Sequence, residues 1–224
     1  FVTAPTTQGV GRTRARSLVL GFQQTGDNRF HAEIYGYQSV TNNIGKGHTT
    51  NEGGADAGYN FNLGKVSGYV GASMISNIAD SQGFQATSFL NNESLHHSVP
   101  AYDVYGSLTL KPLTLIAEYV KVMRRFAITD VAYSNHGARP SAYNVELDYS
   151  FNTGSKPSAV GITYKGSSQA LALGLPQQRY GVVYSVNIWK DTQFRLEYRH
   201  DKNYKDSAAT STVNPTTPAV ATDI

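Results

Sequence analysis

The stretch "SAYNVELDYSF", Ser141 to Phe151, alternates between two kinds of side chain over its whole length. Its odd positions are apolar or aromatic: Tyr143, Val145, Leu147, Tyr149 and Phe151. Its even positions are small, polar or acidic: Ala142, Asn144, Glu146, Asp148 and Ser150. A period of two is typical of a β-strand with different surroundings on its two faces. Strands in soluble proteins usually end after about 5 or 6 residues, whereas a strand crossing a bilayer needs about 9 to 11, so this segment favours a membrane strand.

The same alternation recurs along the chain, and the connections between the alternating segments differ in length. Ten segments carry it: 16–23, 29–38, 55–62, 65–76, 102–110, 113–122, 142–151, 157–165, 179–188 and 192–201. The short connections are 24–28, 63–64, 111–112, 152–156 and 189–191. In strict alternation with them, the long ones are 39–54, 77–101, 123–141, 166–178 and everything from Lys202. Because outer-membrane barrels have short periplasmic turns and long external loops, the sequence predicts an all-β, antiparallel up-and-down transmembrane β-barrel of the bacterial outer-membrane type.

Aromatic residues gather at both ends of these segments. Beside the short turns lie Phe22, Phe30, Phe61, Tyr149, Phe151, Trp189 and Phe194. Toward the long loops lie Tyr102, Tyr119, Tyr143, Tyr164, Tyr180 and Tyr198. Two such girdles are expected where a barrel crosses the headgroup layers, because an aromatic ring with a polar edge prefers that level. The pattern predicts outer-membrane lipid as the partner of the apolar face.

The composition excludes several function classes. The absence of Cys excludes a disulfide scaffold and thiol catalysis. The net charge of +3 is spread along the chain, so nucleic acid is not indicated as a partner. No run of 18 apolar residues predicts a membrane helix, although alternating strands escape such a search. The chain has no GxSxG, no HExxH and no glycine-rich phosphate loop, and we expect neither an enzyme nor a cofactor.

Both ends of the chain predict a fragment of a larger barrel. If 24–28 is a periplasmic turn, the first strand runs inward and residues 1–14 belong to an external loop. The tail "SAATSTVNPTTPAVATDI" is also loop-like and carries no terminal strand. An open edge in lipid would expose unpaired backbone groups. We therefore expect residues 1–224 to form one barrel domain, with about ten strands, whose flanking strands are absent.

Several short sequence segments resemble those of a known family. They are "SNIADSQGF" (76–84), "VPAYDVYGSL" (99–108), "LIAEYV" (115–120), "RPSAYNVELDYSF" (139–151), "ALALGLPQQRYGVVYS" (170–185) and "LEYRHDKNY" (196–204). In this order they resemble the LbtU-type siderophore porins and their FslE/FupA-like relatives of intracellular gammaproteobacteria. The resemblance implies an outer-membrane barrel that imports iron without a TonB-type plug, as a ferric siderophore in some members and as ferrous iron in others, and we expect the ferric siderophore here. A general small-solute porin and a barrel hydrolase remain alternatives, as does a soluble β-sandwich adhesin.

Charged and polar side chains on the polar face of the strands are the candidate pore lining. The acidic and amide members are Glu33, Glu118, Asn144, Glu146, Asp148 and Glu197. The basic members are Arg29, Lys165, Arg179, Arg195 and Arg199. In one interpretation they create a transverse field that attracts an anionic ferric chelate. In the other, neighbouring strands satisfy one another by ion pairs across a wet wall.

Two groups of loop residues are further candidates. Asn77 and Asp80 begin the second long loop, where they could order the loop, contact a ligand at the pore mouth, or merely form an Asx turn. Arg124 and Arg125 enter the third long loop, and Arg139 lies at its far end. These arginines could bind citrate-like carboxylates bidentately, or the phosphates of lipopolysaccharide.

The histidines give no metal or catalytic signature. His96 and His97 are adjacent, so in an extended chain they point apart, and we expect no metal site. His31 and Glu33 share one strand face and form the only candidate dyad for an enzyme. Without a positioned nucleophile beside them, a hydrolase stays the weaker hypothesis.

Overall fold

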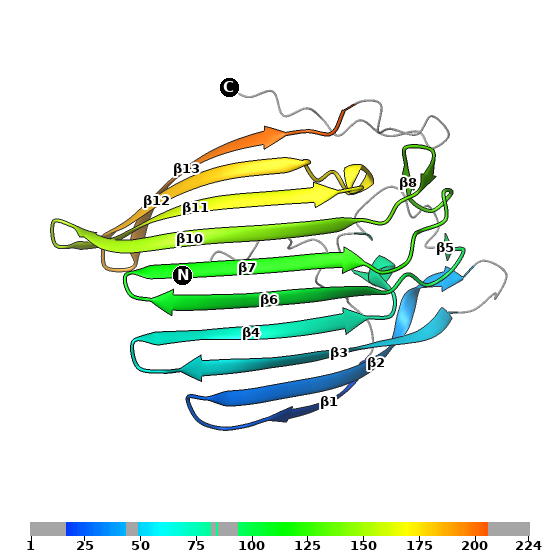
Figure 1. Ribbon diagram of the computed structural model, residues 1–224, viewed down its shortest axis with the longest axis horizontal. Helices are drawn as coiled ribbons and strands as arrows, with labels where there is room; N and C mark the ends of the chain where they lie inside the picture. Colours follow the sequence, from blue (N-terminus) through cyan, green and yellow to red (C-terminus); the bar gives the residue numbers. More distant parts are fainter. Residues whose placement is uncertain (1–16, 44–48, 82–83, 85–93, 206–224) are drawn as a thin grey trace.

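The computed structural model describes residues 17–43, 49–81, 84 and 94–205, and most of these residues form one antiparallel sheet (Figure 1). Ten strands follow one another across it in chain order. They are β1 (Ser17–Gln23), β2 (Arg29–Asn43), β3 (Thr49–Asn62), β4 (Val66–Ile75), β6 (Ala101–Leu110), β7 (Leu113–Val122), β10 (Ser141–Thr153), β11 (Lys156–Ser168), β12 (Gln178–Trp189) and β13 (Thr192–Lys202). Every neighbouring pair is antiparallel, so the predicted all-β, up-and-down architecture is confirmed.

All ten predicted segments are strands, but the loop predicted at 39–54 is largely wrong. Strand β2 continues to Asn43, and β3 begins at Thr49, with Asn42 paired to Thr49 beyond an irregularity in the register. The apolar alternation ends here because the buried positions are the polar residues Ser39 and Thr41, whose hydroxyl groups donate to Asp80. A search for apolar periodicity therefore ends the strand too early.

The short turns lie at one end of the sheet and the long connections at the other, as Figure 1 shows. Gly64 and Gly154 occupy the left-handed region in two of the tight turns, with φ of 81° and 62°. A side chain is disfavoured there, which explains glycine at both positions. The long connections carry the remaining elements: η1 (Ile78–Asp80), β5 (Ser94–Leu95), β8 (Ala132–Tyr133), β9 (His136–Gly137) and η3 (Leu171–Leu173).

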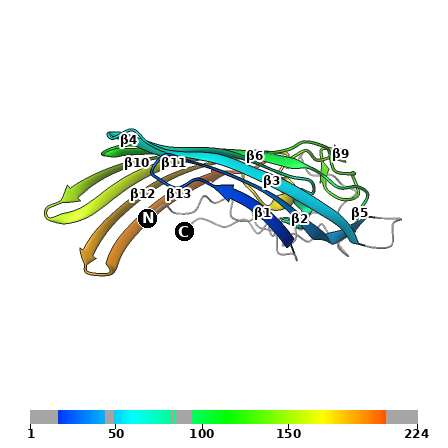
Figure 2. The same cartoon turned by 90° about the horizontal axis from the view of Figure 1, so that it is seen from below.

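The sheet is a shallow arch in Figure 2, and its two faces differ in chemistry. The apolar face is open: Leu20, Val104, Ile162 and Leu196 expose 71%, 50%, 53% and 62% of their surface. No second layer of described residues covers this face. Within those same residues, the edge strands β1 and β13 each pair on one side alone.

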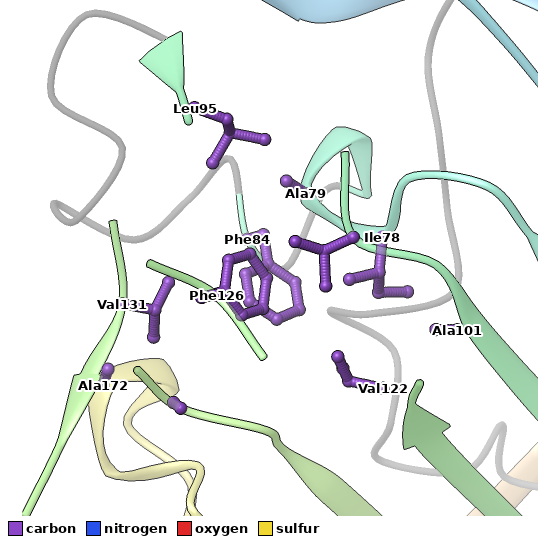
Figure 3. Packing of buried hydrophobic residues seen from close by; sticks show 11 residues of the cluster. Ile78, Ala79, Phe84, Leu95, Ala101, Val122, Phe126, Val131 and Ala172 are labelled. Carbon is purple, nitrogen blue, oxygen red and sulfur yellow. The ribbon is translucent and has the colours of Figure 1, made fainter. Parts of the chain in front are cut away.

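A buried apolar core exists, but it lies among the long connections (Figure 3). Phe84 and Phe126 stack at its centre with ring centroids 5.2 Å apart. Ala101 and Val122, register partners at the loop ends of β6 and β7, pack into it. By strand alternation, Ala101 and Val122 point to the same face of the sheet as Glu118, which is the polar face. The apolar core therefore covers the loop end of the polar face. We call the packed connections, residues 76–81, 84, 94–100, 123–140 and 169–176, the loop cap.

Candidate functional site

A row of polar side chains crosses one half of the sheet at a single level. Register pairing places Glu118, Asn144, Lys165, Arg179 and Asp201 opposite one another, from β7 to β13. The Arg179 guanidinium donates from Nε and one terminal nitrogen to the two Asp201 oxygens, at 2.6 and 2.7 Å. The sequence placed these residues on one face, but which of them meet depends on the register.

Below this row, toward the short turns, the polar face lines a cavity of about 480 Å³. Five of the predicted pore-lining residues border it: Glu146, Asp148, Lys165, Arg195 and Glu197. Thr114, Ser150, Thr163 and Gln193 add neutral polar groups to the wall. The cavity is concave and polar and carries both signs of charge, which suits a small hydrated solute.

Ion pairs engage most of the predicted basic residues. Besides the Arg179–Asp201 pair, Arg195 contacts Glu197 at 3.2 Å and Arg199 contacts Asp201 at 3.8 Å. Of these three pairs, Arg179–Asp201 joins the neighbouring strands β12 and β13, as the pairing interpretation predicts, whereas the other two pairs lie within β13. Such solvent-accessible pairs contribute only about 0 to 1 kcal/mol each to stability, so the charges remain able to act on a passing ion.

On the other half of the sheet, His31 has a different partner from the one expected. Its Nε2 lies 3.0 Å from an Asp56 oxygen on the next strand, and Tyr105 donates to the other Asp56 oxygen at 2.8 Å. Glu33 is exposed and is the register partner of Asp56. His31 thus pairs with Asp56 on the neighbouring strand, and no contact between His31 and Glu33 is found among the described residues.

Asn77 and Asp80 are buried, each with 1% of its surface exposed, and hydrogen bonds within the chain engage both side chains. One Asp80 oxygen accepts hydrogen bonds from the Ser39 hydroxyl at 2.8 Å and from the Thr41 hydroxyl and N–H at 3.0 and 3.1 Å. Asn77 Nδ2 donates to Thr41 Oγ1 and to the second Asp80 oxygen. These bonds reach about 40 residues back along the chain, so the pair clamps the cap to β2 and does more than form a local turn.

Two of the loop arginines donate to backbone carbonyls of the cap and are exposed. Arg125 donates to the Gly137 carbonyl at 3.1 Å and contacts the Gln169 side chain at 3.4 Å through one terminal nitrogen. Arg139 Nε donates to the Val122 carbonyl at 2.9 Å. These bonds give the two arginines a role in ordering the cap, and the binding of carboxylates or phosphates by them stays a prediction. Arg124 is exposed at the loop end of β7.

The histidine pair also belongs to the cap. His96 Nδ1 lies 2.7 Å from an oxygen of the buried Asp130, and the His96 N–H donates to the other oxygen. His97 Nε2 contacts the Arg125 carbonyl at 2.9 Å. Sequence reasoning missed Asp130, since 34 residues separate it from His96. No group of three or more potential metal ligands is found in the described part of the chain.

Tyr204 closes the cap beside β13. Its hydroxyl lies 2.8 Å from Ser167 Oγ and accepts from the Ala170 N–H at 3.3 Å. Burial raises the pKa of this phenol above its usual value, because a phenolate would lose its hydration there. Tyr204 therefore stays neutral and ties the segment after β13 to the cap.

Comparison with known proteins finds relatives that are named only as UPF0422 proteins. The chain is 56% identical over 225 residues to a UPF0422 protein of Coxiella burnetii, covering all of this chain and 48% of that protein. It is 33% identical over 217 residues to a UPF0422 protein of Legionella pneumophila strain Lens, covering 91% of this chain and 40% of that protein. The chain thus spans about half the length of these relatives or less. No family model matches the chain, and no solved structure matches it significantly.

None of the described helices has the length and hydropathy of a membrane span. Both helical elements described in full, η1 and η3, are single turns of three residues within the cap.

Proposed function

We propose that the chain forms part of a bacterial outer-membrane β-barrel that conducts small solutes, with iron complexes as its cargo. The observation that carries the proposal is the division of one sheet into two faces. The apolar face leaves Leu18, Leu20 and Ile34 at least 60% exposed, and the opposite face lines a polar cavity of about 480 Å³. Transfer of each such side chain from water to an apolar phase gains about 1.5 to 3 kcal/mol, so a lipid environment stabilises this face.

Closure of the barrel belongs to the same proposal. An unpaired strand edge in lipid costs several kcal/mol for each unsatisfied backbone group, and β1 and β13 each present one edge among the described strands. The Coxiella burnetii relative is about twice as long as the chain. We propose that strands outside residues 1–224 close the sheet, with the short turns in the periplasm and the loop cap outside.

The iron cargo rests on the resemblance to the LbtU-type siderophore porins. An anionic ferric chelate would meet Lys165 and Arg195 in the cavity wall, and lipid and lipopolysaccharide would surround the barrel, with Arg124 near the phosphates. The same wall carries Glu146, Asp148 and Glu197. This near balance of charge favours a second candidate, a general porin of weak selectivity.

Uptake of a ⁵⁵Fe-labelled ferric siderophore in a deletion strain tests the cargo. We expect uptake to fall in the deletion strain and to return with the full-length gene. Normal uptake in the deletion strain would exclude the iron assignment. Planar-bilayer conductance of the full-length protein tests the pore separately: a conducting protein without an uptake defect would support the general porin, and a protein that does not conduct would contradict both.

A further inference from the structure

Asn144 is a buried amide whose hydrogen-bonding capacity is unused. It lies in β10 on the polar face, and 1% of its surface is exposed. Among the described residues, neither its Oδ1 nor its Nδ2 has a hydrogen-bonding partner. A carboxamide offers two donors and an acceptor, and buried polar groups in native proteins are nearly always satisfied. The Asn144 side chain is therefore built to meet a group from outside the sheet.

Asn144 borders a small cavity together with the cationic residues Lys165 and Arg179. The cavity measures about 40 Å³ and is lined by Asn144, Lys165, Arg179 and the Leu175–Pro176 segment of the cap. A water molecule needs about 10 to 15 Å³ by this measure, so the space fits about three waters or one group of similar size. Lys165 also lines the larger cavity, so it connects the two spaces.

We propose that Asn144 and Lys165 bind the carboxylate of a small anion, or the carboxylate arm of a larger one, beneath the loop cap. Asn144 Nδ2 and the Lys165 ammonium are donors on neighbouring strands, paired in register, and a planar carboxylate accepts from both. Asn144 Oδ1 then accepts from a hydroxyl group or a water that enters with the anion. The inference rests on the proposed function, because it names the class of solute held along the pore.

The surrounding charges favour a monoanionic group and weak binding. Both carboxylate-facing donors of Arg179 are engaged by Asp201, so Arg179 adds little net charge. Glu118 is the register partner of Asn144 on the other side and carries a negative charge toward the site. Lys165 adds positive charge, which Glu146 and Glu197 partly offset in the wall of the larger cavity that it also lines. A site on a conduction path must release its solute, and this balance suits that requirement.

Conductance of the full-length protein in potassium acetate, compared with potassium chloride, tests the proposal. We expect the wild-type conductance to saturate with acetate concentration and to rise linearly with chloride. Asn144→Leu should raise the half-saturating acetate concentration at least ten-fold. Asn152→Leu is the matched control, because Asn152 lies on the same strand and face but is exposed near the short turn. Linear conductance in acetate, or unchanged saturation in Asn144→Leu, would overturn the site and leave water as its occupant.

A second variant and a second measurement keep the test independent of folding and of conduction. Asn144→Asp keeps the size of the side chain and repels a carboxylate, so it should abolish saturation even if the leucine variant fails to insert. If the protein does not conduct, the proposed function fails. The site is then tested by line broadening of ¹³C-labelled acetate with refolded full-length protein. Broadening that Asn144→Asp removes supports the site, and absence of broadening with wild type overturns it.

Discussion

The loop cap buries its apolar side chains, whereas the sheet leaves the apolar side chains of one face exposed. In the cap, Phe84 and Phe126 expose 1% and 2% of their surface, as in the core of a water-soluble protein. In the sheet, Leu18 exposes 81%, while Glu146 on the other face exposes 8%. The cap is thus stabilised by excluding water from its own apolar groups. The described sheet has no such core, and its apolar face is exposed.

The contrast extends to the polar groups. In the cap, the Asp80 and Asp130 carboxylates are buried and hydrogen-bonded to groups from distant parts of the chain, so they hold these segments together. On the sheet, the charged groups lie along a cavity and form pairs of modest strength. Substitutions in the cap should therefore change the stability of the cap, whereas charge substitutions on the sheet should change ion selectivity.

The largest effect is expected at the centre of the cap. Replacing Phe126 by Ala removes one ring of the Phe84–Phe126 stack and should cost about 3 to 5 kcal/mol of cap stability. Hydrogen exchange of the full-length protein should show faster exchange for amides 126–138 and unchanged protection in the centre of β10. Phe22→Ala, at an exposed ring beside a short turn, is the control and should leave the cap unchanged. Equal loosening of β10 would mean that cap and sheet share one core.

The next effect compares the two faces of one strand. Ile162 and Thr163 are adjacent in β11, on the apolar face and on the cavity wall respectively. Ile162→Arg should cost about 2 to 4 kcal/mol if that face meets lipid, because Arg is destabilising near the bilayer midplane. Thr163→Arg should cost much less. Urea unfolding in lipid vesicles measures both, and similar losses at the two positions would contradict the assignment of faces.

A smaller effect is expected from the Asp80 clamp. Asp80→Asn keeps the shape but replaces an acceptor oxygen by a donor among the Ser39 and Thr41 donors, and should cost about 1 to 3 kcal/mol. Because the cap covers the polar face, its loosening should raise single-channel conductance and admit larger solutes. The conductance of Asp27→Asn, in the exposed turn at the opposite end, should match wild type. Unchanged conductance in Asp80→Asn would mean that the cap does not limit the pore.

The sheet could be predicted from the sequence, and the cap could not. Alternation is a local signal, so the strand around Leu147 and its faces follow from neighbouring residues. The bonds that define the cap join His96 to Asp130 and Asp80 to Ser39, across 34 and 41 residues. No local period encodes such pairs. The polar row was predictable as a face but not as a sequence of partners, because a strand's register is decided by the turns and by both neighbours.

The smallest change in stability should accompany a clear change in selectivity. Arg195 and Arg199 lie on the polar face and pair with Glu197 and Asp201 at 3.2 and 3.8 Å. The two arginine side chains are 38% and 52% exposed. Replacing both arginines by Gln should cost less than about 1 kcal/mol, because exposed pairs are weak. Asp201 keeps its pair with Arg179, but at a Debye length of about 8 Å the unpaired Glu197 carboxylate and the loss of two positive charges should shift the pore toward cations. Reversal potentials in a salt gradient measure this shift, and replacing Glu146 and Asp148 by Gln and Asn should move them the other way. Unchanged reversal potentials in a conducting protein would show that these charges serve only to pair with one another, and the cavity wall would then carry no field that a passing chelate could sense.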